Sequence, residues 1–263
     1  MSVDPWFEQQ YNNRAAVPEH PRWFESWSER SARYRDRHPP ITRRYGEGER
    51  ALLDLFPARQ DGAVVHVFLH GGYWQAMDRR SFGFLAEAFN RDGELAVIVG
   101  YDLCPAVTLE RIVEQAGQAL RWLHDHAAEL GGDPERIRVT GHSAGAHLLA
   151  CLLADPAAPP PIAADAISGL YDLRPLRYTG VNAVLGLDEA RAQALSPLFR
   201  QPVQGLETPL RLHVGGLESD EYRRQSLALQ QAWSGHLPVE FIEHPGAHHF
   251  SILNAFLESG FSL

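Results

Sequence analysis

Short apolar segments alternate with helical segments from about Ala63 onward, and this alternation constrains the fold more than any other feature of the chain. The segments rich in Val, Ile and Leu are "AVVHVFLH", "LAVIVG", "RIRVT", "ADAIS", "PLRLHV" and "PVEFIE". Between them lie stretches such as 108–130, where apolar residues recur at helical spacing. The pattern predicts an α/β fold with a mostly parallel central sheet flanked by helices. Because ligands bind at the carboxyl ends of such strands, we expect the functional residues directly after them.

Composition is consistent with one large domain over residues 1–263. The chain is 44% hydrophobic, which is enough for a sizeable core. It lacks an apolar stretch long enough for a membrane helix, and its start, "MSVDPWFEQQ", lacks the basic and apolar regions of a secretory signal. We therefore expect a cytoplasmic protein with no membrane partner. A net charge of −9 with scattered arginines argues against nucleic-acid binding.

Cysteine usage argues against a disulfide framework and against a structural zinc site. Cys104 and Cys151 are the only cysteines, and both lie in apolar surroundings. With so few cysteines, either of the two is improbable. We expect two buried free thiols.

The first fifty residues differ from the rest of the chain. Aromatic residues from Trp6 to Tyr34 are interspersed with many charges, and prolines such as Pro18 and Pro39 interrupt them. This pattern indicates an N-terminal helical segment, residues 1–50, packed on the main domain. Two interpretations remain open at this point: a lid over a pocket, or ordinary packing.

The segment "RIRVTGHSAGAHLLA" contains a candidate nucleophile. Residues Gly141 to Gly145 match G-x-S-x-G, with an apolar strand before the motif and a helix former after it. The chain must turn sharply from strand to helix, which forces Ser143 into a strained backbone conformation where flanking side chains would collide. The serine hydroxyl then stands at a helix N-terminus, whose dipole favours developing negative charge. The alternative, a glycine-rich packing turn, explains less of this context.

The segment "VFLHGGYWQ" follows the first strand of the alternation and can supply an oxyanion hole. A tetrahedral intermediate needs donors already aimed at its oxyanion. Gly71 and Gly72 can point backbone amides into a site, and the amide of Ala144, directly after the serine, completes the set. His70 precedes the nucleophile and is interpreted as a residue that orders this loop. The residues expected to line the substrate pocket are Tyr73, Trp74 and His142.

A serine needs a histidine to accept its proton. In this type of fold that histidine follows the last strands, where "EHPGAHHFSI" offers His244, His248 and His249. His249 precedes Phe250 and the expected final helix and is our choice, with His248 as the second candidate. A zinc cluster is the competing hypothesis, but no H-E-x-x-H motif accompanies these histidines.

Taken together, these motifs resemble those of the α/β-hydrolase superfamily, and most closely the kynurenine formamidase (arylformamidase) family. The matching segments are "HGGYWQ", "YDLCP", "GHSAGAHL", "SGLYDLRPL", the "SP" pair at Ser196-Pro197, and "HHF". The resemblance implies Ser143 as nucleophile, His249 as base, and Gly71, Gly72 and Ala144 as oxyanion donors. It also implies cleavage of a substrate such as N-formylkynurenine, with no cofactor and no metal.

The triad acid is the point where the sequence departs from that family. Three carboxylates follow the strand "LRLHV": Glu218, Asp220 and Glu221. The family usually has an aspartate at the position that aligns with Glu218, and glutamate triads occur in this fold. Asp220 lies two residues further on, and Glu221 is expected to begin a helix, where acids favour the dipole. We favour Glu218, with Asp220 as the alternative.

Function hypotheses from two classes therefore stand side by side. The first is a serine hydrolase acting on a small-molecule acyl substrate, either a formyl arylamide or, as a general carboxylesterase, a short-chain ester. The second is a ligand-binding protein on an inactive hydrolase scaffold, although such scaffolds usually lose a triad member. A homodimer is left open by the sequence.

Overall fold

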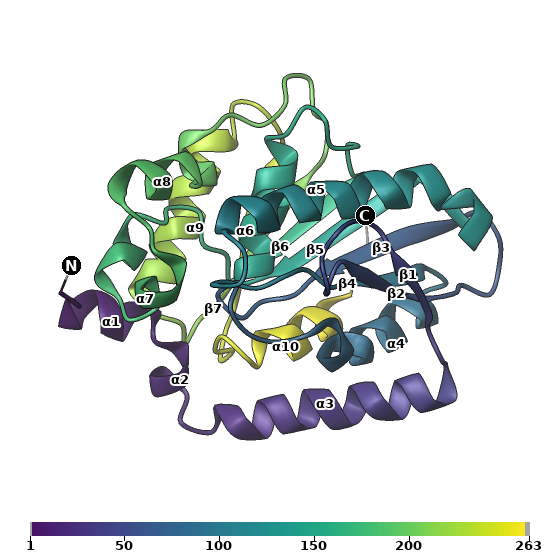
Figure 1. Ribbon diagram of the computed structural model, residues 1–263, viewed down its shortest axis with the longest axis horizontal. Coiled ribbons are helices and arrows are strands. Elements are labelled where there is room, and N and C mark those ends of the chain that lie inside the picture. Colours follow the sequence, from purple (N-terminus) through teal and green to yellow (C-terminus); the bar gives the residue numbers. More distant parts are fainter. Residues whose placement is uncertain (1, 261–263) are drawn as a thin grey trace.

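The computed structural model describes residues 2–260, and its centre is one eight-stranded sheet with the order β1-β2-β4-β3-β5-β6-β7-β8 (Figure 1). Strands β3 to β8 run parallel, whereas β2 pairs antiparallel with both β1 and β4. The strands are β1 Ile41–Arg44, β2 Leu52–Phe56, β3 Ala63–Leu69, β4 Leu95–Val99, β5 Gly132–His142, β6 Ala163–Ile167, β7 Leu210–Gly215 and β8 Val239–His244.

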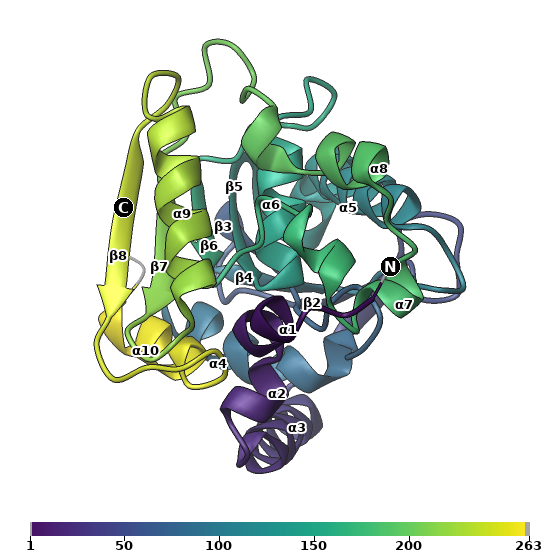
Figure 2. The same cartoon turned by 90° about the vertical axis from the view of Figure 1, so that its left-hand side faces the viewer.

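Helices cover both faces of the sheet, as the α/β pattern predicts (Figures 1 and 2). In the view of Figure 1, α5 and α6 lie above the sheet, whereas α4 and α10 lie below it and α3 lies beyond them. The helices are α1 Pro5–Tyr11, α2 Asn13–Ala16, α3 His20–Arg37, α4 Gly83–Arg91, α5 Leu109–His126, α6 Ala144–Leu153, α7 Asn182–Leu185, α8 Glu189–Ala194, α9 Asp220–Trp233 and α10 Ile252–Ser259.

Successive side chains of each strand point to opposite faces of the sheet, so the core has two layers, one on each face. In β4, Val97 and Val99 belong to the layer that contains apolar residues of α5, α6 and α9. Ala96 and Ile98, which point to the other face, pack in the layer with apolar residues of α3, α4 and α10. Because both faces of β4 are covered, this strand reads as a continuous apolar run.

All six strands expected from the alternation are present, and the fold class is confirmed. The sheet extends further than the sequence indicated, because β1 and β2 add an antiparallel edge. The segment 1–50 is therefore not helical throughout: its helices end at Arg37, and residues 41–44 join the sheet.

Buried polar contacts join the N-terminal helices to the rest of the fold. Arg35 of α3 forms an ion pair with Asp54 of β2 over 2.6 Å. The Asp54 carboxylate is fully buried, and it also lies 3.2 Å from Arg79. A buried carboxylate requires such partners, so α3 is held against the sheet by a contact that is costly to break.

Within residues 2–260, none of the helices is both long and apolar enough to cross a bilayer.

Candidate active site

Ser143 occupies the sharp turn between β5 and α6. Its backbone has φ 55° and ψ −115°, a left-handed conformation that is strained for a serine. The flanking glycines are required by space, because a Cβ on Gly141 would lie 2.3 Å from the carbonyl oxygen of Gly145. A Cβ on Gly145 would in turn lie 1.9 Å from the carbonyl oxygen of Leu69 in the neighbouring strand β3. The G-x-S-x-G spacing thus fixes how the serine is presented.

His249 and Glu218 complete a chain of hydrogen bonds that starts at Ser143. The Oγ atom of Ser143 lies 3.0 Å from Nε2 of His249. The Nδ1 atom of the same ring lies 2.6 Å from Oε1 of Glu218. The three side chains follow β5, β8 and β7, and the parallel register brings the ends of these strands to one edge of the sheet. A serine, a histidine and a carboxylate in this order form the geometry of nucleophilic catalysis.

The Glu218 carboxylate is held by more than the histidine. Its second oxygen, Oε2, accepts hydrogen bonds from Ser168 Oγ and from the Gly215 amide, both at 2.7 Å. The side chain is 1% exposed, so these donors replace the water that a carboxylate needs. The longer side chain of glutamate is accommodated because the loop after β7 folds back onto its own strand end.

The other two acids of this cluster lie elsewhere. Asp220 is exposed at the first residue of α9. Glu221 is buried and accepts a hydrogen bond from the Tyr11 hydroxyl over 2.5 Å, and it also forms an ion pair with Arg224. Of the three carboxylates, Glu218 alone contacts His249 in the part of the chain that the structure describes.

The three histidines near the C-terminus point to different partners. The Nδ1 atom of His248 accepts hydrogen bonds from the amides of Phe250 and Ser251, each over 3.2 Å. His244 lies with Nε2 2.9 Å from Nδ1 of His213. Residues 2–260 hold no group of three or more His, Cys, Asp or Glu side chains arranged to bind a metal ion.

The loop after β3 lies directly beside the serine. A Cβ on Gly71 would lie 3.0 Å from Cβ of Ser143, so the glycine allows the loop to approach this closely. Gly72 has φ +114°, and a Cβ there would lie 2.3 Å from the carbonyl oxygen of Ala76. Ala144 begins α6, where the amides of the first turn have no partner within the helix. Gly71 and Ala144 therefore both lie directly beside Ser143, and Gly72 lines the same cavity as the serine.

His70 helps to fix the conformation of the loop after β3. Its Nδ1–H donates to the carbonyl of Gly71 over 2.7 Å, and the Tyr101 hydroxyl donates to the carbonyl of His70 over 2.6 Å. Its ring stacks on Tyr101 with centroids 4.2 Å apart. Burial lowers the pKa of His70 to about 4, so the ring is neutral at neutral pH.

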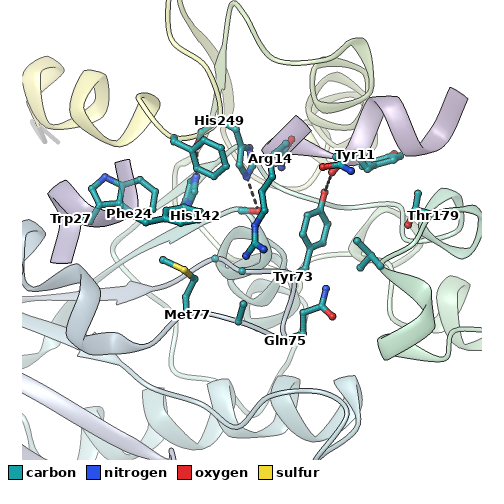
Figure 3. A pocket seen from close by; sticks show the side chains of 18 of the residues that line it. Tyr11, Arg14, Phe24, Trp27, Tyr73, Gln75, Met77, His142, Thr179 and His249 are labelled. Atoms are coloured by element: carbon teal, nitrogen blue, oxygen red, sulfur yellow. Dashed lines mark hydrogen bonds between the residues drawn. The ribbon is translucent and has the colours of Figure 1, made fainter. Parts of the chain in front are cut away.

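A cavity of about 420 Å³ opens onto the Ser143–His249 pair (Figure 3). Tyr73 and His142 line it, as expected, together with Phe24, Trp27 and Phe250. Its wall combines aromatic and apolar side chains with several polar ones, which is typical of a small-molecule site. The N-terminal segment contributes residues from Glu8 to Trp27, so it forms part of the wall.

One of the three pocket residues expected from sequence, Trp74, has other surroundings. Trp74 does not line the cavity: it is fully buried in the core and packs edge-on to His147, with centroids 4.9 Å apart. The expectation that Trp74 lines the pocket is therefore wrong, and nothing in the local sequence distinguishes it from Tyr73, which has a similar positive φ and does line the cavity. His142 does line the cavity, and it also donates from Nε2 to the carbonyl of His249 over 2.9 Å.

A cluster of hydroxyls next to the site was not expected from sequence. Tyr222 lies against the His249 ring, with centroids 4.8 Å apart. Its hydroxyl is 2.9 Å from that of Tyr73 and accepts a hydrogen bond from Asn13 Nδ2 over 2.7 Å. Burial raises the pKa of Tyr222, and hydrogen bonds with Tyr73, Asn13 and Ser143 oppose that rise. The signal in the sequence that could have found Tyr222 is its place in the first turn of the helix after the acid-bearing loop.

Comparison with known proteins agrees with this geometry. A family model of the alpha/beta hydrolase fold matches residues 66–175. A kynurenine formamidase of Danio rerio is 31% identical over 230 residues, covering 83% of this chain and 77% of the relative.

The chain belongs to the kynurenine formamidase family of α/β hydrolases.

Two further relatives show how wide this similarity is. A carboxylesterase of Mycobacterium tuberculosis is 31% identical over 191 residues, covering 71% of this chain and 56% of the relative. A solved structure from Silicibacter sp. TM1040, provisionally named a thioesterase, superposes with a TM-score of 0.84 and 30% identity over 95% of this chain and 94% of that one. The resemblance drawn from the motifs is confirmed, and the protein is an α/β-hydrolase enzyme of the esterase and amidase type.

Proposed function

We propose that this kynurenine formamidase family member hydrolyses N-formylkynurenine to kynurenine and formate. The observation that carries the proposal is the Ser143–His249–Glu218 chain of hydrogen bonds opening onto an aromatic cavity of about 420 Å³. A cavity of this size accepts an aryl group beside a small acyl group. The relative from Danio rerio supports the same substrate class.

In the proposed mechanism, Ser143 Oγ attacks the formyl carbonyl carbon while its proton passes to Nε2 of His249. The amides of Gly71, Gly72 and Ala144 donate to the oxyanion that forms. The C–N bond then breaks as Nε2–H of His249 protonates the leaving amine, which leaves a formyl ester on Ser143. Water attacks this ester and gives a proton to His249, formate departs, and the serine regains its proton.

Glu218 has a positioning and electrostatic role in this scheme. Its contact with Nδ1 holds the His249 ring in the tautomer whose Nε2 lone pair faces Ser143. It also stabilises the imidazolium that forms once the ring accepts the serine proton. Because Ser168 and Gly215 bond the other carboxylate oxygen, the acid itself is held in place.

The direct test is an assay of the purified protein on N-formylkynurenine, with Ser143→Ala and the exposed Ser28→Ala as a matched pair. Loss of Ser143 is expected to reduce turnover on the order of 10⁴-fold or more, whereas Ser28→Ala keeps the wild-type rate. A fluorophosphonate probe should label the wild type and fail to label Ser143→Ala. Labelling without hydrolysis of the formyl arylamide would contradict the substrate while supporting the serine.

A general short-chain carboxylesterase is the second candidate, and the Mycobacterium tuberculosis relative favours it. The two candidates differ in the bond they cleave best. A formamidase is expected to prefer the formyl arylamide strongly over p-nitrophenyl esters of acetate, butyrate and hexanoate. An esterase shows the reverse order, so kcat/KM across these substrates separates them.

A further inference from the structure

Arg14, an exposed residue of the N-terminal segment, carries a positive charge on the wall of the cavity. The residue belongs to α2 and lines the same cavity as Ser143 and His249. Figure 3 shows its side chain directed into the cavity, between His249 and Tyr73 in that view. Its guanidinium carbon lies 5.7 Å from the centre of the Phe24 ring, which also lines the cavity. The charge therefore faces the space where a substrate would lie.

This guanidinium has no anionic partner in the protein as described, residues 2–260: it forms neither an ion pair nor a side-chain hydrogen bond there. Glu8 also lines the cavity, but its carboxylate is already engaged. Its Oε2 accepts from the Gly180 amide over 2.8 Å, and its Oε1 accepts from Asn12 Nδ2 over 2.9 Å. Of the two charged residues on this part of the wall, Arg14 is the one left for a ligand.

The backbone around Arg14 is fixed to the site by its neighbours. Asn13 is buried and donates to the Tyr222 hydroxyl over 2.7 Å, next to the His249 ring. On the other side, the Tyr73 hydroxyl donates to the carbonyl of Tyr11 over 2.6 Å. These contacts hold α2 at a set position relative to Ser143. An arginine whose backbone is held in this way can discriminate between substrates by the position of their negative charge.

We infer that Arg14 binds a carboxylate on the leaving group of the substrate. The inference rests on the proposed function in one respect: a formyl or other small acyl group has no room for an anion, so the anion belongs to the amine or alcohol portion. A planar guanidinium matches a carboxylate with two parallel hydrogen bonds. Since the chain carries a net charge of −9, an anionic substrate also needs a local cation to enter this cavity.

The test compares substrate pairs that differ only in charge. The acetate esters meta-acetoxybenzoate, meta-acetoxyphenylacetate and meta-acetoxyphenylpropanoate are each assayed beside the corresponding neutral primary amide. Esters are used because any serine hydrolase with this site cleaves them, whether or not it acts on formyl arylamides. The readout is the ratio of kcat/KM for the carboxylate to kcat/KM for its amide.

Wild-type protein is expected to prefer the carboxylate at one tether length, because the backbone that carries Arg14 is held at a set position. Arg14→Gln should lower that ratio on the order of tenfold or more, mainly through KM, and Arg14→Lys should fall between the two. The exposed Arg22→Gln, in the same segment but outside the cavity wall, is the matched control and keeps the wild-type ratio. Equal ratios in wild type and Arg14→Gln would overturn the inference, as would equal losses on both members of each pair.

The test of the Arg14 anion site and the test of N-formylkynurenine hydrolysis can succeed or fail independently. If Arg14→Gln lowers the ratio but N-formylkynurenine is not cleaved, the anion site stands and the formamidase assignment fails. If N-formylkynurenine is cleaved but the ratio does not depend on Arg14, the assignment stands and the anion site fails.

Discussion

Tyr11 and Glu221 lie 210 positions apart in the sequence and share a buried hydrogen bond of 2.5 Å. The Tyr11 hydroxyl also accepts a hydrogen bond from Gln225 Nε2 over 2.7 Å. One end of this contact is in α1 and the other in α9, whose N-terminus follows the loop that carries Glu218. The N-terminal segment is thus bonded to the element that supports the proposed catalytic acid.

Tyr11→Phe is therefore expected to destabilise the protein by about 1–3 kcal/mol. The substitution keeps the ring in the core but removes the donor to the buried Glu221 and the acceptor for Gln225. Denaturant unfolding of the variant and wild type measures the change. Tyr178→Phe is the matched control, because that half-exposed hydroxyl has only a 3.4 Å contact with Arg177, and its loss should stay within about 0.5 kcal/mol. Equal effects of both variants would show that the Tyr11 contact adds no stability.

The choice between two acids leads to a second prediction. Glu218→Gln should lower kcat on the order of 10²- to 10⁴-fold, because the amide can no longer hold the charged form of His249. Asp220→Asn should remain within about twofold of wild type, because Asp220 is exposed on α9. Steady-state rates on one substrate for both variants decide the matter. A larger loss for Asp220→Asn would reverse the assignment.

The residues that sequence could place are those fixed by local rules. The glycines around Ser143 are dictated by collisions within the turn and with the end of the neighbouring strand β3, and Glu218 and His249 follow strands whose order sets where they meet. No such rule covers a contact made over a long separation. Asn13 and Tyr222 are 209 positions apart, and nothing in the sequence of either segment predicts their hydrogen bond.

Trp74 and the strand β2 show two other limits of sequence reasoning. Trp74 lies two residues after the glycine pair of the loop after β3, and only its complete burial beside His147 shows that its side chain packs in the core. The segment Leu52–Phe56 pairs antiparallel with β1 and β4, and both β1 and β2 lie outside the strand–helix alternation that identified the other six strands. In both cases the deciding fact is a position in the tertiary structure that apolar character does not encode.

The oxyanion loop gives a third prediction. Gly72→Ala should lower kcat on the order of 10²- to 10³-fold, the cost of losing one oxyanion donor. A Cβ at this position would lie 2.3 Å from the carbonyl oxygen of Ala76, so the loop must rearrange and the Gly72 amide must shift from its present position. Gly62→Ala is the matched control: its φ of +73° is also left-handed, but a Cβ there meets nothing within 4 Å. That variant should lose roughly 1 kcal/mol of stability and keep its kcat.

Measured kcat values at saturating substrate, with thermal unfolding as a check on folding, distinguish these effects. If both alanine variants lose the same activity, then the strain of a left-handed alanine, rather than the displaced loop, accounts for the result.

The buried histidines predict that acid destabilises the fold. His147 of α6 donates from Nε2 to the carbonyl of Leu195 over 2.8 Å, and burial lowers its pKa to about 4. An unfolded histidine has a pKa near 6.5, so between these values the unfolded chain binds a proton that the folded chain does not. Stability is then fully present above about pH 6.5 and falls as the pH drops toward 4. His147 alone should account for roughly 2 kcal/mol of the loss between about pH 7 and pH 5.

His147→Gln removes this proton site while an amide can still donate to Leu195, so its stability should fall less steeply with acid than that of wild type. Urea unfolding at about pH 7 and at about pH 5 gives the change in the free energy of unfolding between these pH values for each protein. This change is compared between variant and wild type, whatever the variant's stability at neutral pH. The exposed His236→Gln is the matched control, because that side chain lies outside the core and its variant should follow the wild-type pH dependence. A pH dependence of His147→Gln as steep as that of wild type would mean that this ring is not held neutral in the folded protein.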